Sequence, residues 1–248
     1  MHFSIITAVW NRRATLGDAL ASLDAQSYRK FEHVVQDGGS TDGTLALLAA
    51  NSDRRMRLVS EPDGGIYDAL NRAMTRASGD VIGLLHSDDF LAHEHVLRDV
   101  AALFEATGAD AVYGDLDYVS AVDPRRIVRR WRSGTYSPDK LRRGWMPPHP
   151  ALFLKRSVIE RWGGYDTSFR IAADYDSILR YFGKGGISAA YLPQVLVKMR
   201  VGGTSNASFR QILRKSHEDY RALRQNEIGG LGTLARKNLS KIGQFMSL

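Results

Sequence analysis

Apolar and polar positions follow two different periods between residues 3 and 113. Apolar, β-branched runs predict strands at Phe3–Val9, Phe31–Gln36, Met56–Ser60, Val81–His86 and Ala109–Tyr113. Apolar residues at helical spacing lie between these runs and predict helices at Ala14–Ala25, Thr41–Ala50, Ile66–Ala77 and Glu94–Ala106. Regular alternation of strands and helices favours an α/β fold with a mostly parallel, Rossmann-like central sheet and helices on both faces. Such sheets bind ligands at the carboxyl ends of their strands.

The pattern is looser after Gly114. Residues 127–131 suggest a strand, residues 145–150 a loop stiffened by prolines, and residues 157–162 and 171–182 helices. From Ser205 onward, eight basic residues against three acidic ones contribute +5 of the chain's net charge of +7. Two apolar stripes at helical spacing run through this region. We therefore expect one globular domain over residues 1–204 and a basic, amphipathic helical tail over residues 205–248.

Composition and charge narrow the class of protein. The 248 residues suffice for one substantial α/β domain, and the positive charge suits nucleic acid, an acidic lipid surface or a phosphate-bearing substrate. The absence of cysteine excludes disulfides and thiolate metal sites. The apolar runs are too short to cross a bilayer, and the N-terminus lacks the pattern of a signal peptide. A cytoplasmic protein is the expectation from these features.

Acidic residues stand where predicted strands end and where a helix begins. Asp37 is followed by two glycines, so its carboxylate can accept hydrogen bonds from a base or a ribose, or serve an ordinary turn. Asp88 and Asp89 follow a buried strand, and such oxygen ligands suit Mg²⁺ or Mn²⁺ that bridges phosphates; helix capping is the alternative. Asp174 lies near a helix start, where an ionised carboxylate is stabilised and can act as a general base, or merely charge the helix end.

Taken in order, these segments resemble the family 2 inverting glycosyltransferases of the GT-A fold. The similarity is greatest to small bacterial enzymes of exopolysaccharide, capsule or O-antigen assembly. The matching stretches are residues 5–12, 35–44, 60–71, 77–89, 149–153, 163–166, 173–176 with 179–180, and 202–205. Each stretch is weak alone, but together they span about four-fifths of the chain in the family's order.

The resemblance implies a nucleotide pocket and a metal site. The residues that would form the nucleotide pocket are Thr7, Val9, Asn11, Asp37, Asp63, Asn71 and Arg200. Within this set Asp37 would contact the base and Arg200 a phosphate. Asp88, with Asp89 beside it, would hold the Mg²⁺ or Mn²⁺ that bridges the diphosphate of a UDP, GDP or dTDP sugar.

The resemblance also implies an acceptor side. Asp174 would remove the proton from the acceptor hydroxyl as it attacks the anomeric carbon from the face opposite the nucleotide, which inverts the anomer. His149 and Trp145 lie in the loop that would face the acceptor, although a lone histidine is more often structural. The acceptor would be a glycan or a polyprenyl-linked sugar. Residues 125–132, rich in arginine, would hold its phosphates or simply protect an edge strand.

Two positions depart from the family's pattern. His86 replaces the first acid of the metal motif, and Ala173 replaces the acid before the base. The chain also lacks the acceptor motif and transmembrane helices of processive synthases, so we expect addition of a single sugar. For the tail we expect peripheral contact with an anionic membrane, and packing on the protein is the alternative.

Two other functions fit parts of the sequence. Nucleotidyl transfer to sugar phosphates also uses metal-bound nucleotide, but the glycine-rich phosphate loop after the first strand is missing. A basic nucleic-acid-binding protein would fit the charge, but no motif for nucleic-acid recognition is present, so we expect no nucleic-acid partner.

Overall fold

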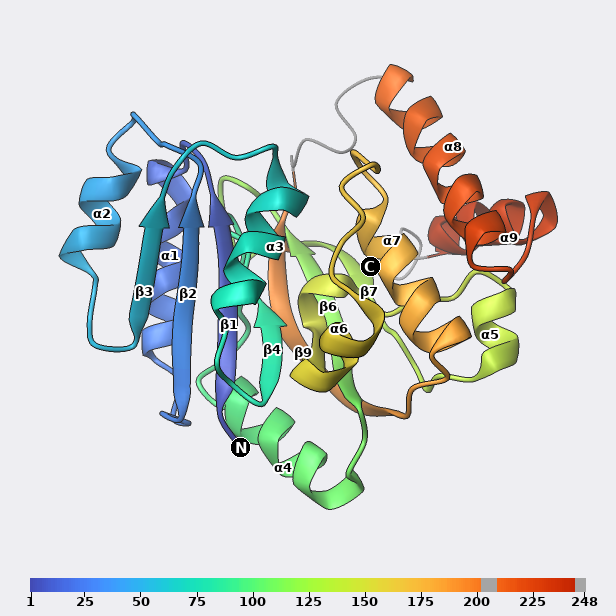
Figure 1. Ribbon diagram of the computed structural model, residues 1–248, viewed down its shortest axis with the longest axis horizontal. Helices are drawn as coiled ribbons and strands as arrows, with labels where there is room; N and C mark the ends of the chain where they lie inside the picture. The colour runs from blue at the N-terminus through green and yellow to red at the C-terminus, as the bar shows by residue number, and fades with distance from the viewer. Residues whose placement is uncertain (202–208, 244–248) are drawn as a thin grey trace.

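A nine-stranded sheet forms the centre of the computed structural model, which describes residues 1–201 and 209–243 (Figure 1). The strands are β1 (Phe3–Val9), β2 (Phe31–Asp37), β3 (Met56–Ser60), β4 (Val81–Leu84), β5 (Phe90–Leu91), β6 (Ala111–Val119), β7 (Ile127–Trp131), β8 (Leu152–Lys155) and β9 (Ala189–Arg200). The helices are α1 (Arg13–Asp24), α2 (Thr44–Ala50), α3 (Ile66–Arg76), α4 (Val96–Thr107), α5 (Pro138–Arg142), α6 (Arg156–Trp162), α7 (Ala173–Ile178), α8 (Phe209–Gln225) and α9 (Leu231–Gly243). A 3₁₀ turn at His149–Ala151 precedes β8, and a π-helical segment at Leu179–Lys184 continues α7.

The sheet confirms the predicted α/β fold class. Strands β3, β2, β1 and β4 are parallel neighbours, so their carboxyl ends share one edge. Beyond β4 the sheet is mixed, because β8 runs antiparallel to both β4 and β6, while β6 and β9 are parallel. No strand was predicted for the segments that form β5, β8 and β9.

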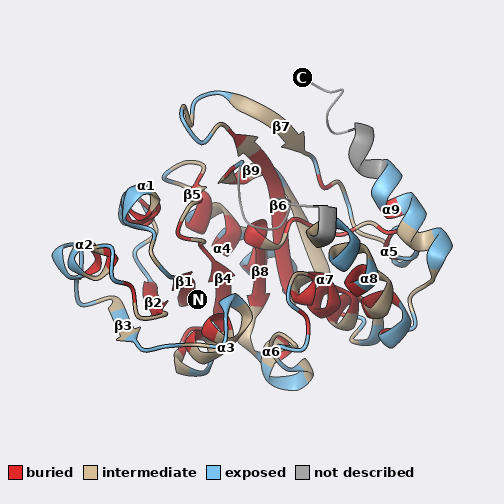
Figure 2. Cartoon of the chain, turned by 90° about the horizontal axis from the view of Figure 1, so that it is seen from above, coloured by how far each residue is buried: buried red, intermediate tan, exposed pale blue. Residues whose placement is uncertain are grey.

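Two faces of the sheet are covered by different helices (Figure 2). Side chains of β1 alternate between them, as the period of a strand requires. Phe3, Ile5 and Val9 pack in one buried cluster with side chains of α1, α2 and α4. Ile6 and Ala8 pack in another with side chains of α3. The continuous apolar run in the sequence of β1 is therefore the signature of a strand buried on both faces.

The C-terminal helices pack on the rest of the molecule. Ala222 and Leu223 of α8 are buried in one cluster with apolar residues of β6, β8 and α7. The predicted boundary between residues 204 and 205 and the motif at residues 202–205 lie outside the described residues. None of the helices within the described ranges is long and apolar enough to cross a membrane.

Candidate active site

Asp37 ends β2 as a completely buried carboxylate. Its Oδ2 accepts hydrogen bonds from the N–H groups of Gly39 (3.0 Å) and Ser40 (2.9 Å) and from the hydroxyl of Ser60 (2.7 Å). Its Oδ1 makes no hydrogen bond to the described residues. Since buried polar atoms are nearly always paired, this oxygen is suited to a ligand that donates a hydrogen bond.

The loops after β1, β2 and β3 meet around this carboxylate. Asn11 adopts a left-handed backbone (φ 51°), a conformation that asparagine tolerates better than most residues. Its Oδ1 accepts from the N–H of Thr41, and its own N–H donates to the hydroxyl of Ser40. A Cβ at Gly38 would lie 2.8 Å from Oδ2 of Asp63, so the glycine leaves room for the Asp63 side chain beside the loop. The structure thus brings Asn11, Asp37 and Asp63 together.

Three other residues assigned to the nucleotide pocket are engaged within the scaffold. Thr7 is 1% exposed, and its hydroxyl donates to the carbonyl of Leu85. Val9 is buried, and its carbonyl accepts from Gly38. Asn71 uses both ends of its amide on the backbone of Tyr165, each at 2.8 Å. The side-chain polar groups of Thr7 and Asn71 therefore hold the protein together rather than stand open to a ligand.

The acidic pair after β4 is braced by Arg200 at the end of β9. The carbonyl of Asp88 accepts from the Arg200 guanidinium at 2.9 Å, and Oδ1 of Asp89 accepts from the Arg200 N–H at 3.2 Å. The same guanidinium pairs with Asp18 of α1. The phosphate contact that the sequence assigned to Arg200 stays a prediction, and in the structure its guanidinium and N–H hold the acidic loop.

Asp88 and Asp89 differ in their surroundings. Asp88 is partly exposed, whereas Asp89 is 1% exposed and its Oδ2 makes no hydrogen bond to the described residues. Burial, and next the charge of Asp88, raise the pKa of Asp89 well above its usual value. A cation beside the pair would relieve both penalties, so the residues fit Mg²⁺ or Mn²⁺. The described residues hold no cluster of three or more His, Cys, Asp or Glu ligands, so the other ligands would be substrate and water oxygens.

His149 connects the predicted base to the loop that carries this pair. Its Nδ1 lies 3.1 Å from Oδ2 of Asp174, and its Nε2 lies 3.0 Å from Nε2 of His86. Burial acts to raise the pKa of Asp174, but the charge and hydrogen bond of His149, with the charge of Lys237, hold it well below its usual value. Burial, and next His149, lower the pKa of His86 to about 3.

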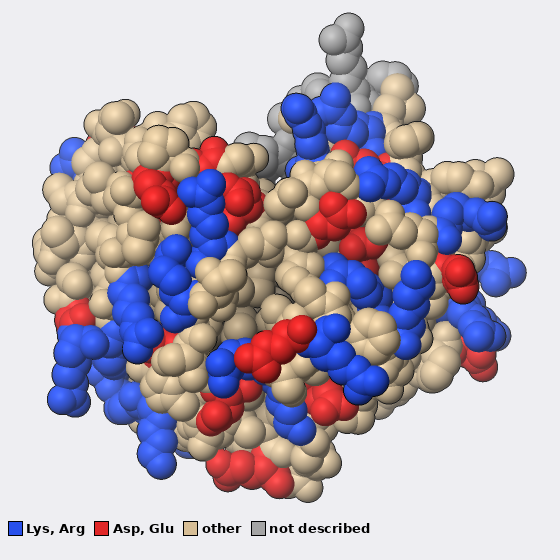
Figure 3. Space-filling model, viewed as in Figure 1, with Lys and Arg blue, Asp and Glu red and all other residues tan. Residues whose placement is uncertain are grey.

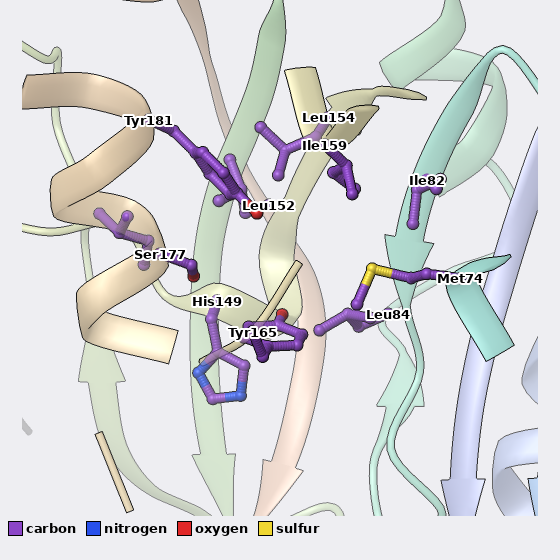
Figure 4. A pocket seen from close by; sticks show the side chains of 11 residues that line it. Met74, Ile82, Leu84, His149, Leu152, Leu154, Ile159, Tyr165, Ser177 and Tyr181 are labelled. Carbon is purple, nitrogen blue, oxygen red and sulfur yellow. The ribbon is translucent and has the colours of Figure 1, made fainter. Parts of the chain in front are cut away.

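The ring of His149 closes one end of a small internal cavity of about 20 Å³ (Figure 4). Most of the lining is apolar and comes from α3, β4, β8 and α6, including Met74, Leu84, Leu152 and Ile159. A space of this size holds at most about one water molecule. The side chains of Asp174 and His149 nevertheless keep 20% and 27% of their surface exposed, so both remain accessible to a substrate.

Trp145, predicted to face the acceptor, is part of an aromatic cluster. Its indole N–H donates to the carbonyl of Ser133 at 2.7 Å. Its ring lies 5.4 to 6.2 Å from those of Tyr113, Tyr136 and Phe182. These contacts hold Trp145 at the start of the 145–150 loop, and the same loop carries His149.

Tyr118 of β6 is a site residue that the sequence analysis missed. Burial raises the pKa of Tyr118. The charge of the Arg129 guanidinium, which lies 3.7 Å from the ring centroid, lowers this pKa, and the charges of Asp89 and Asp174 raise it. The phenol therefore lies within the electric field of both Asp89 and Asp174. The only signal in the sequence was the continuation of the strand past Gly114, where periodicity weakened.

Comparisons with known proteins match this chain to sugar-transferring enzymes. A family profile described as "Glycosyl transferase family 2" matches residues 4–162. A "PGL/p-HBAD biosynthesis glycosyltransferase" of Mycobacterium bovis is 34% identical over 209 residues, which cover 82% of this chain and 79% of that protein.

Two solved structures share the fold. S. aureus TarS, residues 1–349, in complex with UDP-GlcNAc, has a TM-score of 0.70 at 17% identity and covers 91% of this chain, which in turn spans 65% of that one. The mannosyltransferase PcManGT of Pyrobaculum calidifontis, in complex with GDP-Man and Mn²⁺, has a TM-score of 0.68 at 18% identity, over 100% of this chain and 76% of that one.

Proposed function

The chain belongs to glycosyltransferase family 2, and from this premise we propose that it moves a single sugar from a nucleoside-diphosphate sugar to an acceptor hydroxyl, with inversion and with a bound divalent cation. The acceptor is a glycan or a polyprenyl-linked sugar of surface polysaccharide synthesis. Family membership selects glycosyl transfer over the nucleotidyl transfer that the sequence had left as an alternative. The UDP-GlcNAc and GDP-Man complexes of the structural neighbours support UDP and GDP sugars as the first donors to test.

The observation that carries this proposal is the link from Asp174 through His149 to His86. His86 lies two residues before Asp88, so the predicted base and the predicted diphosphate site flank one short chain of contacts. An inverting displacement needs the base on the acceptor side and the leaving group on the opposite side of the reacting carbon. Asp174 as the base and Asp88 as the residue nearest the leaving group would supply these two separate roles.

The chain's own residues would carry the reaction as follows. The O–H bond of the acceptor breaks, its proton goes to Oδ1 of Asp174, and the oxygen forms a bond to the anomeric carbon. The bond from that carbon to the diphosphate breaks, and its electron pair leaves with the nucleotide. When bound at Asp88 and Asp89, a cation would supply positive charge that stabilises the departing diphosphate. The free Oδ1 of Asp37 would accept from the base, with Asp63 and Asn11 beside it.

We also propose that residues 1–204 form the catalytic unit and that the tail at 205–248 contacts an anionic membrane at its cytoplasmic face. On α8, Ile212 and Leu213 are 49% and 56% exposed, and on α9 Leu231 and Leu239 are 71% and 64% exposed. Basic side chains gather over α8 (Figure 3). Exposed apolar residues with basic neighbours are what binding to an anionic bilayer requires.

The test of the catalytic proposal is the variant Asp174→Asn. An amide cannot take the hydroxyl proton, so we expect kcat to fall by at least about 100-fold while donor affinity is unchanged. Release of nucleoside diphosphate from a panel of UDP, GDP and dTDP sugars measures turnover, and calorimetry measures donor affinity. Asp139→Asn is the matched control, because Asp139 is an exposed acid in the first turn of α5. Full turnover in Asp174→Asn would reassign the base, and a wild-type protein inactive with every donor would contradict the proposal itself.

A further inference from the structure

The predicted base is the end of a chain of three side chains. Asp174 comes from the start of α7, His149 from the turn before β8, and His86 from the loop after β4. The contacts that join them are 3.1 Å and 3.0 Å long, and the two imidazole centroids lie 5.2 Å apart at 68°. His86 stands where the family's pattern has the first acid of the metal motif. His86, the residue that departs from the family's pattern, therefore contacts His149 directly.

Hydrogen-bond chemistry fixes the roles of the ring nitrogens. An ionised Asp174 only accepts, so Nδ1 of His149 carries a proton and donates it to Oδ2. Nε2 of a neutral His149 is then an acceptor, and His86 donates to it. If His149 gains a second proton, its Nε2 becomes a donor, and a neutral His86 can accept by changing tautomer.

The two oxygens of Asp174 are consequently unequal. Among the described residues, Oδ2 is held by His149 and Oδ1 lies 3.5 Å from the hydroxyl of Tyr67, while the N–H of Tyr175 also stabilises the ionised carboxylate. The Tyr67 hydroxyl donates its hydrogen bond to the carbonyl of Ile171 at 2.6 Å. Oδ1 thus keeps its capacity to accept a proton, and its direction is set by what holds Oδ2.

We propose that His149 is a positioning residue for Asp174, and that its protonation state decides whether this carboxylate can act as the base. This inference rests on the proposed function of Asp174. The neutral imidazole holds Oδ2 and leaves Oδ1 basic, whereas the imidazolium forms an ion pair with the carboxylate and withdraws its capacity to take the acceptor proton. His86 allows the neutral state of His149, because it can donate to Nε2, which a carboxylate cannot do.

The groups that surround the pair set the sign of the pH dependence. His149 faces Asp174 of α7 and His86 after β4, and it lines the same cavity as Tyr165. Asp174 in addition lies near Tyr67 of α3 and within the field of Lys237 of α9. As pH falls, His149 gains a proton and the basicity of Asp174 drops, so transfer slows on the acidic side. As pH rises, His149 loses that proton and transfer recovers.

The variants His149→Asn and His149→Ala distinguish two roles of His149: orienting the carboxylate of Asp174 and gaining a second proton. The amide nitrogen of asparagine is attached to Cγ, as Nδ1 of histidine is, so it can still donate to Oδ2 but cannot take a proton. For the wild type we expect kcat to rise with pH as His149 loses its second proton. For His149→Asn we expect no such rise. For His149→Ala we expect a loss of about 100-fold in kcat, because the carboxylate is no longer oriented.

Donor affinity, measured by calorimetry, should be the same in all three proteins. An acidic limb that survives unchanged in His149→Asn would overturn the proposal, since the titrating group would then be elsewhere. A rate for His149→Ala equal to that of the wild type would overturn it as well.

A measurement without substrate distinguishes failure of this proposal from failure of the proposed function. Nitrogen-15 spectra of the imidazoles report which ring nitrogen carries the proton, and a titration reports when the second proton is bound. We expect the Nδ1–H form of His149 in the wild type, and in Asp174→Asn a His149 that binds its second proton at lower pH. The same titration of His149 in both proteins would overturn the ion pair. A normal titration in a protein that transfers no sugar would instead contradict only the proposed function.

His86→Asp tests the role of the second histidine with the same spectra. A carboxylate at position 86 accepts from Nε2 of His149 and favours the imidazolium, so we expect His149 to hold its second proton to higher pH than in the wild type. His86→Asn, which is neutral and can donate or accept, is the control. No difference between the two variants would show that the residue at position 86 does not act on His149.

Discussion

At the scale of single residues, three buried or half-buried carboxylates of this protein share one arrangement. In Asp37 and Asp174 Oδ2 is held by the protein, and in Asp89 Oδ1 is held. The other oxygen of Asp37 and Asp89 is buried without a hydrogen bond to the described residues, and that of Asp174 has one long contact. Fixing one oxygen orients a carboxylate, and the second oxygen is then available for a ligand.

The metal site gives a prediction at this scale. A nucleoside diphosphate and Mn²⁺ should together raise the melting temperature of the wild type by roughly 5 to 10 °C at 100-fold excess over Kd, because a ligand that binds only the folded form stabilises it. In Asp88→Ala we expect the Mn²⁺-dependent part of this shift to disappear, as it should in the wild type with EDTA. Asp139→Asn serves again as the control. A shift in Asp88→Ala as large as in the wild type would place the cation elsewhere.

At the scale of elements, α8 holds the start of α7. The carboxylate of Glu218, 7% exposed, accepts from the N–H groups of Arg170, Ile171 (2.8 Å) and Ala172 (3.0 Å). No side chain of α7 itself caps this end. Because a negative charge at a helix N-terminus is favourable, Glu218 stabilises the turn from which Asp174 projects.

Two further contacts join the C-terminal helices to α7. Asn226 donates to Oδ1 of Asp176 at 2.7 Å. The Nζ of Lys237 pairs with Asp219 at 2.8 Å and lies 3.1 Å from the ring centroid of Tyr175. The segment predicted as an appended tail is therefore also a support for the helix that carries the base.

Glu218→Ala is the corresponding prediction. Loss of the cap should lower the free energy of unfolding by about 1 to 2 kcal/mol and reduce kcat, since Asp174 loses its fixed backbone. Chemical denaturation measures the first effect, and donor-saturated turnover the second. Glu227→Gln, a change at an exposed glutamate just beyond α8, should alter neither. A Glu218→Ala protein with unchanged kcat would mean that α7 keeps its geometry without the cap.

At the scale of the whole molecule, the two faces of α8 have different surroundings. The inner face of α8 is committed to the catalytic unit, whereas the outer apolar residues Ile212 and Leu213 have basic neighbours. Removal of the tail would remove the proposed membrane contact and the support of α7 together, because Glu218 lies on α8 and Asn226 directly follows that helix. A test of membrane contact therefore needs substitutions on the outer face alone.

Ile212→Asp with Leu213→Asp is such a variant. We expect the wild type to float with vesicles that contain phosphatidylglycerol and to stay in solution with phosphatidylcholine vesicles, and the double variant to lose the first behaviour. Val122→Asp, at a residue 95% exposed in the hairpin between β6 and β7, controls for an apolar residue lost elsewhere. Equal flotation of wild type and double variant would refute contact through α8.

The sequence by itself determined the first half of this fold. Local periodicity fixed β1 to β4 and the helices between them, because β1, β2 and β4 are buried on both faces and the helices on one. The order of strands also implied that Asp37 and Asp88 lie at one edge, since parallel strands share their carboxyl ends. The family motifs marked Asp174 and His149 as candidates, but as separate ones.

The tertiary structure alone decided which of these residues touch. Asn71 and Arg200 hold parts of the fold together, because their amide and guanidinium bond to backbone groups from segments distant in sequence, and their contact with a nucleotide stays a prediction. His86, His149 and Asp174 are separated by 63 and 25 positions, and only the docking of α7 and β8 against β4 brings them into contact. Periodicity reports burial within an element, but a hydrogen bond between elements depends on how they are packed, and that is a property of the folded chain alone.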